Sequence, residues 1–249
     1  MCVAALAWQA HPRWRLVAIG NRDEYHERLA VALAHWDDGS GIIAGRDLVG
    51  GGTWLGVNEA WRFALITNRR GFDNPDPARR SRGELVTATL AGDDLPAELN
   101  AYNPFNLLVT GENGLEYLTN RPDSLRTTLG HGIYGLSNGA LDEPWPKTLA
   151  LKAALTDWLA DGVADLAPLF AILASEDRPA LGLSAREASE IPVEPSDTPP
   201  FIRSDVYGTR CSTVVTVDAQ GAGRIVERRF DCAGTPTGDT ALDFRWPAA

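Results

Sequence analysis

Short apolar runs separated by turn-forming residues recur along most of the chain. Paired runs of this kind predict antiparallel hairpins over residues 2–19, 53–68, 105–119 and 206–230. Single short strands are predicted over residues 41–47 and 133–139. A helical period predicts three helices, one that begins at Ser81 and two that span residues 146–159 and 166–174. Ser81 and Glu84 have the spacing of a capping box, so we expect the Ser81 side chain to cap the first helix.

The order of these elements indicates the fold class. Strands come first, then a helix, more strands, two helices and a last set of strands. Because the two kinds of element are segregated, we predict an α+β fold with mainly antiparallel sheets and not a doubly wound parallel sheet. Residues 176–204 are rich in Pro, Glu, Asp and Ser and predict a long loop, whereas residues 231–249 show no period.

Composition excludes several classes of function. A net charge of −10 argues against non-specific binding to nucleic acid or to anionic lipid. The three cysteines favour reduced thiols in a cytoplasmic compartment, and we identify no signal peptide and no apolar run long enough to span a membrane. The four histidines are scattered and the Gly50-Gly51-Gly52 run does not fit a dinucleotide motif, so we predict no metal site and no required cofactor.

Five arginines interrupt this acidic background within 14 residues: Arg69, Arg70, Arg79, Arg80 and Arg82. Such a cluster is usually part of a solvated loop. It also suits the lip of a site for an anionic small molecule, because guanidinium groups match phosphate and carboxylate geometry.

The first hairpin places Cys2 close to the polar segment Asn21-Arg22-Asp23-Glu24. If Met1 is removed, Cys2 carries a thiol and a free α-amine, which is a usable general base near neutral pH. Two interpretations are open at this point. Cys2 is either a nucleophile or a small buried apolar residue of a terminal strand, and the 21–24 segment is either a site or a buried ion-pair network.

Four segments together resemble one known family. They are Asn21-Arg22-Asp23-Glu24, residues 51–58, residues 65–68 and residues 207–213, and they are similar to the NRDE-motif family, also called the transport and Golgi organisation protein 2 family. The resemblance extends from Cys2 to Phe230, so we expect a single domain over residues 1–249. Its layout is similar to N-terminal nucleophile hydrolases of the choloylglycine hydrolase type, which implies a four-layer αββα sandwich of two mainly antiparallel sheets.

The same resemblance implies roles for six residues. Cys2 would be the nucleophile, Asp23 would hold its α-amine, and Arg22 would lie near the thiol. Asn68 and Asn138 would form the oxyanion hole and position the amine, and Arg210 would face the thiol. These roles are chemically reasonable, because a nearby cation lowers the pKa of a thiol and amide donors stabilise an oxyanion.

Two functions follow from this resemblance. We favour binding or trafficking of an amphipathic anionic ligand, for which haem and acyl-coenzyme A are candidates, with ligand contacts at Asn21, Glu24, Trp54, Arg69 and Arg70. Tryptophans would wall the cleft, although most of them suit the core equally well. The alternative is a cofactor-independent cysteine amidohydrolase that cleaves a C–N amide bond. The ligand and the oligomeric state are not encoded in any motif that we identify.

Overall fold

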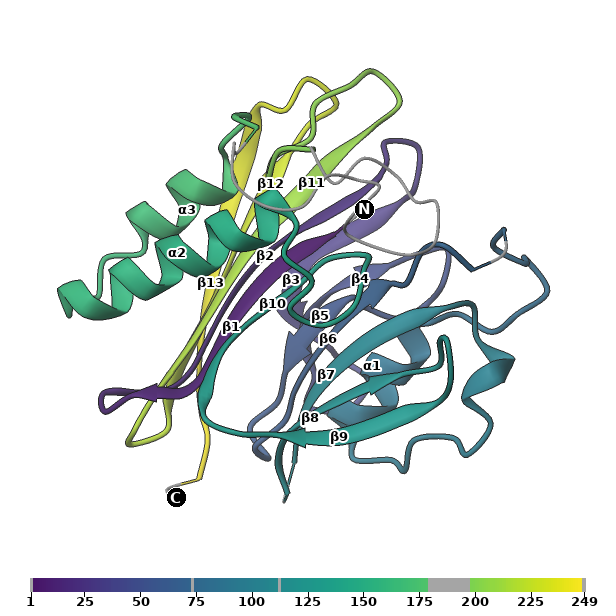
Figure 1. Cartoon of the computed structure of the whole chain (residues 1–249), viewed down its shortest axis with the longest axis horizontal. Helices are drawn as coiled ribbons and strands as arrows, with labels where there is room; N and C mark the ends of the chain where they lie inside the picture. Colours follow the sequence, from purple (N-terminus) through teal and green to yellow (C-terminus); the bar gives the residue numbers. More distant parts are fainter. Residues whose placement is uncertain (1, 73, 112, 179–197, 248–249) are drawn as a thin grey trace.

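The computed structural model describes residues 2–72, 74–111, 113–178 and 198–247. Two antiparallel sheets lie face to face, with helices on their outer faces (Figure 1). The described residues contain no helix that is both long and apolar enough to cross a membrane.

The first sheet carries the start of the chain in its interior. Its strand order is β10-β1-β2-β11-β12-β13, and every neighbouring pair is antiparallel. The strands are β1 (Val3–His11), β2 (Trp14–Tyr25), β10 (Gly132–Leu136), β11 (Tyr207–Asp218), β12 (Ala222–Phe230) and β13 (Pro236–Arg245). The helices α2 (Pro146–Asp161) and α3 (Ala167–Leu173) cover its outer face. Cys2 directly precedes β1, which lies between β10 and β2.

The second sheet is a meander in sequence order. It contains β3 (Ala30–His35), β4 (Ile43–Asp47), β5 (Leu55–Val57), β6 (Phe63–Asn68), β7 (Phe105–Gly111), β8 (Gly114–Thr119) and β9 (Leu125–Leu129). The helix α1 (Gly83–Ala91) packs on its outer face, and a short 3-10 turn spans Leu99–Ala101.

Three apolar layers hold these elements together. The central layer joins the inner faces of the two sheets through residues such as Leu6, Leu16 and Leu65. A second layer packs α2 and α3 on the first sheet, and a third packs α1 on the second sheet. The predicted α+β class and four-layer αββα sandwich are therefore confirmed.

Several local predictions need correction. The strands β3, β9 and β13 were not predicted, and each lies at a sheet edge. β13 is mostly exposed, so it has no apolar period, and Arg224–Asp243 and Arg228–Asp239 pairs help to join it to β12. The Ser81 cap is also wrong: Arg82 is the N-cap residue, and Glu84 pairs with Arg80. Residues 179–197 of the predicted loop lie outside the described residues.

Candidate functional site

A cavity of about 610 Å³ lies where the ends of β2, β4, β6, β11 and β12 meet the segment 76–83. Its size is within the range of small-molecule sites. Eight arginines line it: Arg22, Arg28, Arg46, Arg79, Arg80, Arg82, Arg210 and Arg229. Five acidic residues also line it: Asp23, Glu24, Asp47, Asp76 and Glu227. The cavity is therefore a basic site in a chain whose net charge is −10.

Cys2 lies in the wall of this cavity. The register of β1 on β2 pairs Val3 with Asn21, which puts Cys2 beside Arg22. The Ser137 hydroxyl donates a 2.8 Å hydrogen bond to the Cys2 carbonyl oxygen and so fixes the start of the strand. Burial raises the pKa of the Cys2 thiol, and so does the Asp23 carboxylate. A hydrogen bond from the Asp23 main-chain N–H and the charge of Arg22 act in the opposite direction.

Asp23 is held rigidly beside Cys2. Its side chain is 4% exposed, and its Oδ1 accepts a 2.7 Å hydrogen bond from the Thr209 hydroxyl on β11. Burial raises the pKa of Asp23, although the positive charges of Lys147 and Arg22 and the Thr209 hydrogen bond oppose this effect. The pair of β2 and β11 therefore fixes a carboxylate next to the thiol.

Arg22 belongs to an ion-pair network at the cavity wall. Its Nη2 lies 3.0 Å from Asp47 Oδ2, and Arg28 Nε lies 2.6 Å from the same oxygen. Glu24 lies 4.0 Å from Arg22 and 3.7 Å from Arg28. The structure thus combines both interpretations of this segment, because its charged residues form a network and also line a cavity.

The two predicted asparagines contact each other, but their side chains lie differently. Asn68 is part of the cavity wall, and its side-chain amide makes no hydrogen bond with the described residues. Asn138 is fully buried, and its Nδ2 donates a 2.7 Å hydrogen bond to the Asn68 carbonyl oxygen. The amide of Asn68 is therefore the better placed of the two to meet a ligand.

Arg210 lines the cavity together with Cys2, and its guanidinium group also bonds to the main chain. Its Nη1 donates hydrogen bonds to the carbonyl oxygens of Tyr25 at 2.8 Å and His26 at 2.9 Å, so it holds the turn after β2. Two other arginines of the cavity wall, Arg22 and Arg82, have charges that interact with that of the Cys2 thiol.

Asn21 also departs from its predicted place. It is fully buried and is not part of the cavity wall. Its Nδ2 donates to the carbonyl oxygens of Leu173 and Pro200, and its Oδ1 accepts from the Ser212 hydroxyl at 2.6 Å. Its amide is thus used to join β2 to α3, so the prediction of a ligand contact at Asn21 is replaced by a structural role.

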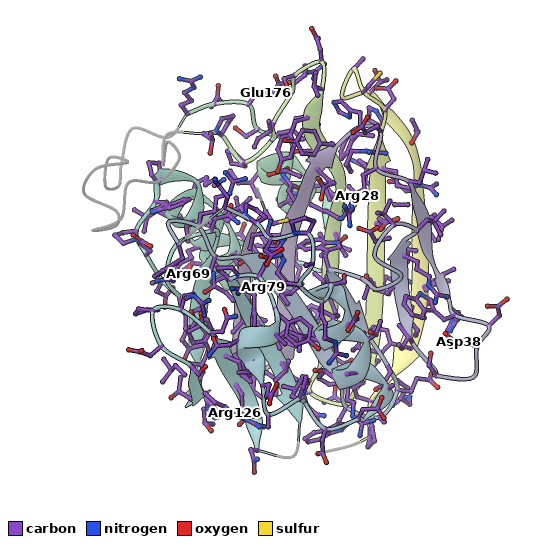
Figure 2. All side chains as sticks on the ribbon, turned by 90° about the vertical axis from the view of Figure 1, so that its right-hand side faces the viewer. Arg28, Asp38, Arg69, Arg79, Arg126 and Glu176 are labelled. Carbon is purple, nitrogen blue, oxygen red and sulfur yellow. The ribbon has the colours of Figure 1, made fainter. Side chains whose placement is uncertain are left out.

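The remaining predicted ligand contacts divide into two groups. Glu24 and Trp54 line the cavity, whereas Arg69 and Arg70 do not. Arg69 stacks over Phe72 at 5.7 Å, and the main chain of Arg70 bonds to the Asn138 carbonyl oxygen. Figure 2 labels Arg28 and Arg79, two arginines of the wall, together with Arg69. Of the arginine cluster, residues 79, 80 and 82 reach the cavity.

Sequence reasoning missed a second thiol in the wall. Cys211 on β11 lies on the opposite side of β2 from Cys2, and its Cα pairs with those of Arg22 and Arg229. Burial raises the pKa of Cys211 well above its usual range, and the nearby Glu227 adds to the effect. All three cysteines are free thiols. The described residues include no group of three or more His, Cys, Asp or Glu that could hold a metal ion.

The fold and the site define an αββα sandwich with a cysteine, a buried carboxylate and several arginines around one cavity. The family model for Transport and Golgi organisation 2 matches residues 1–232, and the chain belongs to this family.

Relatives with this name match most of the chain. The Transport and Golgi organization protein 2 homolog of Bos taurus is 32% identical, and the Homo sapiens homolog is 30% identical; each match covers 92% of both chains. Among solved structures, the Caenorhabditis elegans N-acylethanolamine-hydrolyzing acid amidase ortholog is similar over 85% of this chain and 91% of its own. Its TM-score is 0.43 at 10% identity.

Proposed function

We propose that the protein binds an amphipathic organic anion in the arginine-lined cavity, with haem and acyl-coenzyme A as the first candidates. The observation that carries this proposal is the excess of arginines over acidic residues in the wall. Val31, Trp54, Ile66 and Phe230 belong to the same wall, so an apolar group and an anionic group would both find partners.

Arg82 and Arg229 are the guanidinium groups that we assign to the anion. Neither forms an ion pair within 4.0 Å among the described residues, whereas Arg22, Arg28 and Arg79 each have a carboxylate partner. Arg82 also lies close enough to Cys2 for their charges to interact. A carboxylate or phosphate group of the ligand could accept charge-assisted hydrogen bonds from either arginine.

A titration with haem and, separately, with a long-chain acyl-coenzyme A tests this proposal. Arg82→Ala and Arg229→Ala should each weaken binding by about 1.5–3 kcal/mol, the loss of one charge-assisted hydrogen bond. Arg126→Ala is the matched control, because Arg126 pairs with Glu116 on β8 and lies at the bottom of the view in Figure 2, well below Arg28. Equal affinities in all four proteins, or no binding by the wild type, would refute the proposal.

A specific observation favours a second candidate, a cysteine amidohydrolase. Cys2 lies in the same cavity wall as the Asp23 carboxylate, which the Thr209 hydroxyl holds in place, and Asn68 belongs to that wall too. After removal of Met1, the α-amine would take the thiol proton, the sulfur would attack the amide carbon, and Asn68 would stabilise the oxyanion. Collapse of this intermediate would break the C–N bond as the protonated α-amine returns the proton to the leaving nitrogen. A water molecule would then hydrolyse the thioester, which releases the carboxylic acid and restores the Cys2 thiol.

The two candidates make opposite predictions for Cys2→Ala. In a hydrolase this substitution removes several orders of magnitude of amide-cleavage rate. In a binding protein it leaves the affinity for haem or acyl-coenzyme A within a few-fold of the wild type. Intact-mass measurement of the purified protein shows whether Met1 is retained, which would block the amine that the hydrolase needs.

A further inference from the structure

A buried ammonium group lies behind the Cys2 centre. Lys147 is one of only two lysines in the chain, the other being Lys152. It is the second residue of α2, its side chain is 0% exposed, and its Nζ has no hydrogen bond with the described residues. The centroid of the Trp145 ring lies 6.0 Å from Nζ.

The acidic residues of the preceding segment are occupied elsewhere. Asp142 Oδ1 accepts hydrogen bonds from the Gly135 N–H and from Lys152 Nζ, and Glu143 Oε2 accepts from the Ala140 N–H. The groups whose charges act on Lys147 are instead Asp23, Cys2 and Arg70. Leu151, one helical turn after Lys147, belongs to the same apolar layer as Val3, the neighbour of Cys2. Because Lys147 is not in the cavity wall, it approaches the Cys2 centre from the helix side.

We propose that Lys147 is a positioning residue of the Cys2 centre, where its ammonium group stabilises the Asp23 carboxylate and the Cys2 thiolate. The inference rests on the thiol chemistry of the second candidate function, but it needs no substrate. Arginine supplies nearly all other positive charge in this chain. A lysine with no hydrogen bond at a fully buried position is expensive to keep, and an apolar side chain of similar length would fill the same space.

The electrostatic balance around the two groups agrees with this role. Burial lowers the pKa of Lys147, while Asp23 and Cys2 raise it. By the same interaction, a charged Lys147 lowers the pKa of the thiol and of the carboxylate. The other charged or titratable groups that act with Cys2 are the N-terminal amine, Arg22 and Asp23 on β2, Cys211 on β11, Arg70 after β6 and Arg82 at the start of α1.

The rate of Cys2 alkylation by iodoacetamide, measured between pH 6 and pH 10, tests the proposal. Trypsin would release Cys2, Cys211 and Cys232 in separate peptides, because Arg13, Arg210 and Arg229 separate them, so mass spectrometry can follow Cys2 alone. Lys147→Met should move the pH profile to higher pH and slow alkylation at neutral pH by about tenfold, which corresponds to one pKa unit. Lys147→Arg keeps the charge, so its rate of Cys2 alkylation at neutral pH should stay within about threefold of the wild-type rate.

Lys152→Met is the matched control, since it removes the other lysine from the same helix. Its Cys2 profile should coincide with that of the wild type. A Lys147→Met profile that also coincides with the wild type, whatever its thermal stability, would overturn the proposal. If Lys147→Met does not fold, Lys147→Arg decides the question. A Lys147→Arg protein whose Cys2 is alkylated about tenfold more slowly, as expected for a residue without charge, would also overturn the proposal. Failure of the wild type to cleave amides, with the shift present, would contradict only the hydrolase function.

Discussion

The Thr209 hydroxyl donates a 2.7 Å hydrogen bond to the carboxylate of Asp23, although the two residues are 186 positions apart. The hydroxyl oxygen of Thr209 also accepts a hydrogen bond from the Ile202 N–H. Because Thr209 and Asp23 face each other in the register of β11 on β2, the sheet itself fixes the carboxylate beside Cys2.

Thr209→Val should lower the free energy of unfolding by about 1–3 kcal/mol, because it leaves a buried carboxylate and a main-chain N–H without this partner. Thr209→Ser keeps the hydroxyl, so its free energy of unfolding should fall markedly less than that of Thr209→Val. Urea denaturation at pH 7 measures both variants. Equal stability of the valine and serine variants would show that the Thr209 hydroxyl does not stabilise the folded state.

Glu227→Gln should flatten the dependence of stability on pH. Glu227 is 5% exposed, and burial raises its pKa, although the Leu33 N–H and Arg229 oppose the effect. The folded state therefore keeps the proton at pH values where the unfolded state has lost it. The raised pKa of Glu227 therefore contributes stability that is fully present below the pKa of Glu227 in the unfolded chain. This contribution is lost as the pH rises through the pKa of Glu227 in the folded protein.

Glutamine cannot ionise, so the variant should gain stability over the wild type as the pH rises from 4 to 8. Urea denaturation at several pH values in that range gives the comparison. Parallel curves for the two proteins would mean that Glu227 does not titrate abnormally in the fold.

Asp47→Asn should show the opposite pH dependence. Burial alone would raise the pKa of Asp47, but hydrogen bonds from Arg28 and the Gly50 N–H, with the charge of Arg22, outweigh it and hold the pKa below its usual range. Its contribution is present above the unfolded pKa and disappears as the pH falls through the folded pKa. We expect a loss of about 1–3 kcal/mol at pH 7 that shrinks below pH 4. A loss that is the same at both pH values would argue against an ion-pair origin.

Gly52→Ala should disturb the arginine segment of the cavity. A Cβ at Gly52 would lie 2.5 Å from the Gly83 carbonyl carbon and 2.6 Å from its oxygen, and main-chain atoms cannot move aside cheaply. Displacing the start of α1 should cost about 1–3 kcal/mol and weaken anion binding through Arg82. Gly130→Ala is the control, because its Cβ meets no atom of the described chain within 4 Å. Stability and affinity that match this control would contradict the close approach seen at Gly52.

The sequence by itself determined the interior of this protein. Its apolar periods located the inner strands of both sheets and all three helices, because burial on a sheet or helix face imposes a regular spacing on apolar residues. The missed strands, β3, β9 and β13, lie at sheet edges, where a strand is stabilised by main-chain pairing and needs no apolar pattern. The family motif similarly brought Cys2, Arg22, Asp23, Asn68 and Arg210 to attention before their positions were known.

Only the tertiary structure decided which side chains face the cavity and how their charges are used. Asn21 and Arg22 are neighbours in one motif, yet Asn21 bonds to α3 and Arg22 lines the cavity, because successive residues of a strand point to opposite faces. Arg70 and Arg82 belong to one basic cluster, but only Arg82 reaches the wall. Lys147 carries no motif at all: its proximity to Asp23 and Cys2 arises because α2 packs across β1, a contact that joins residues about 145 positions apart and leaves no local pattern in the sequence.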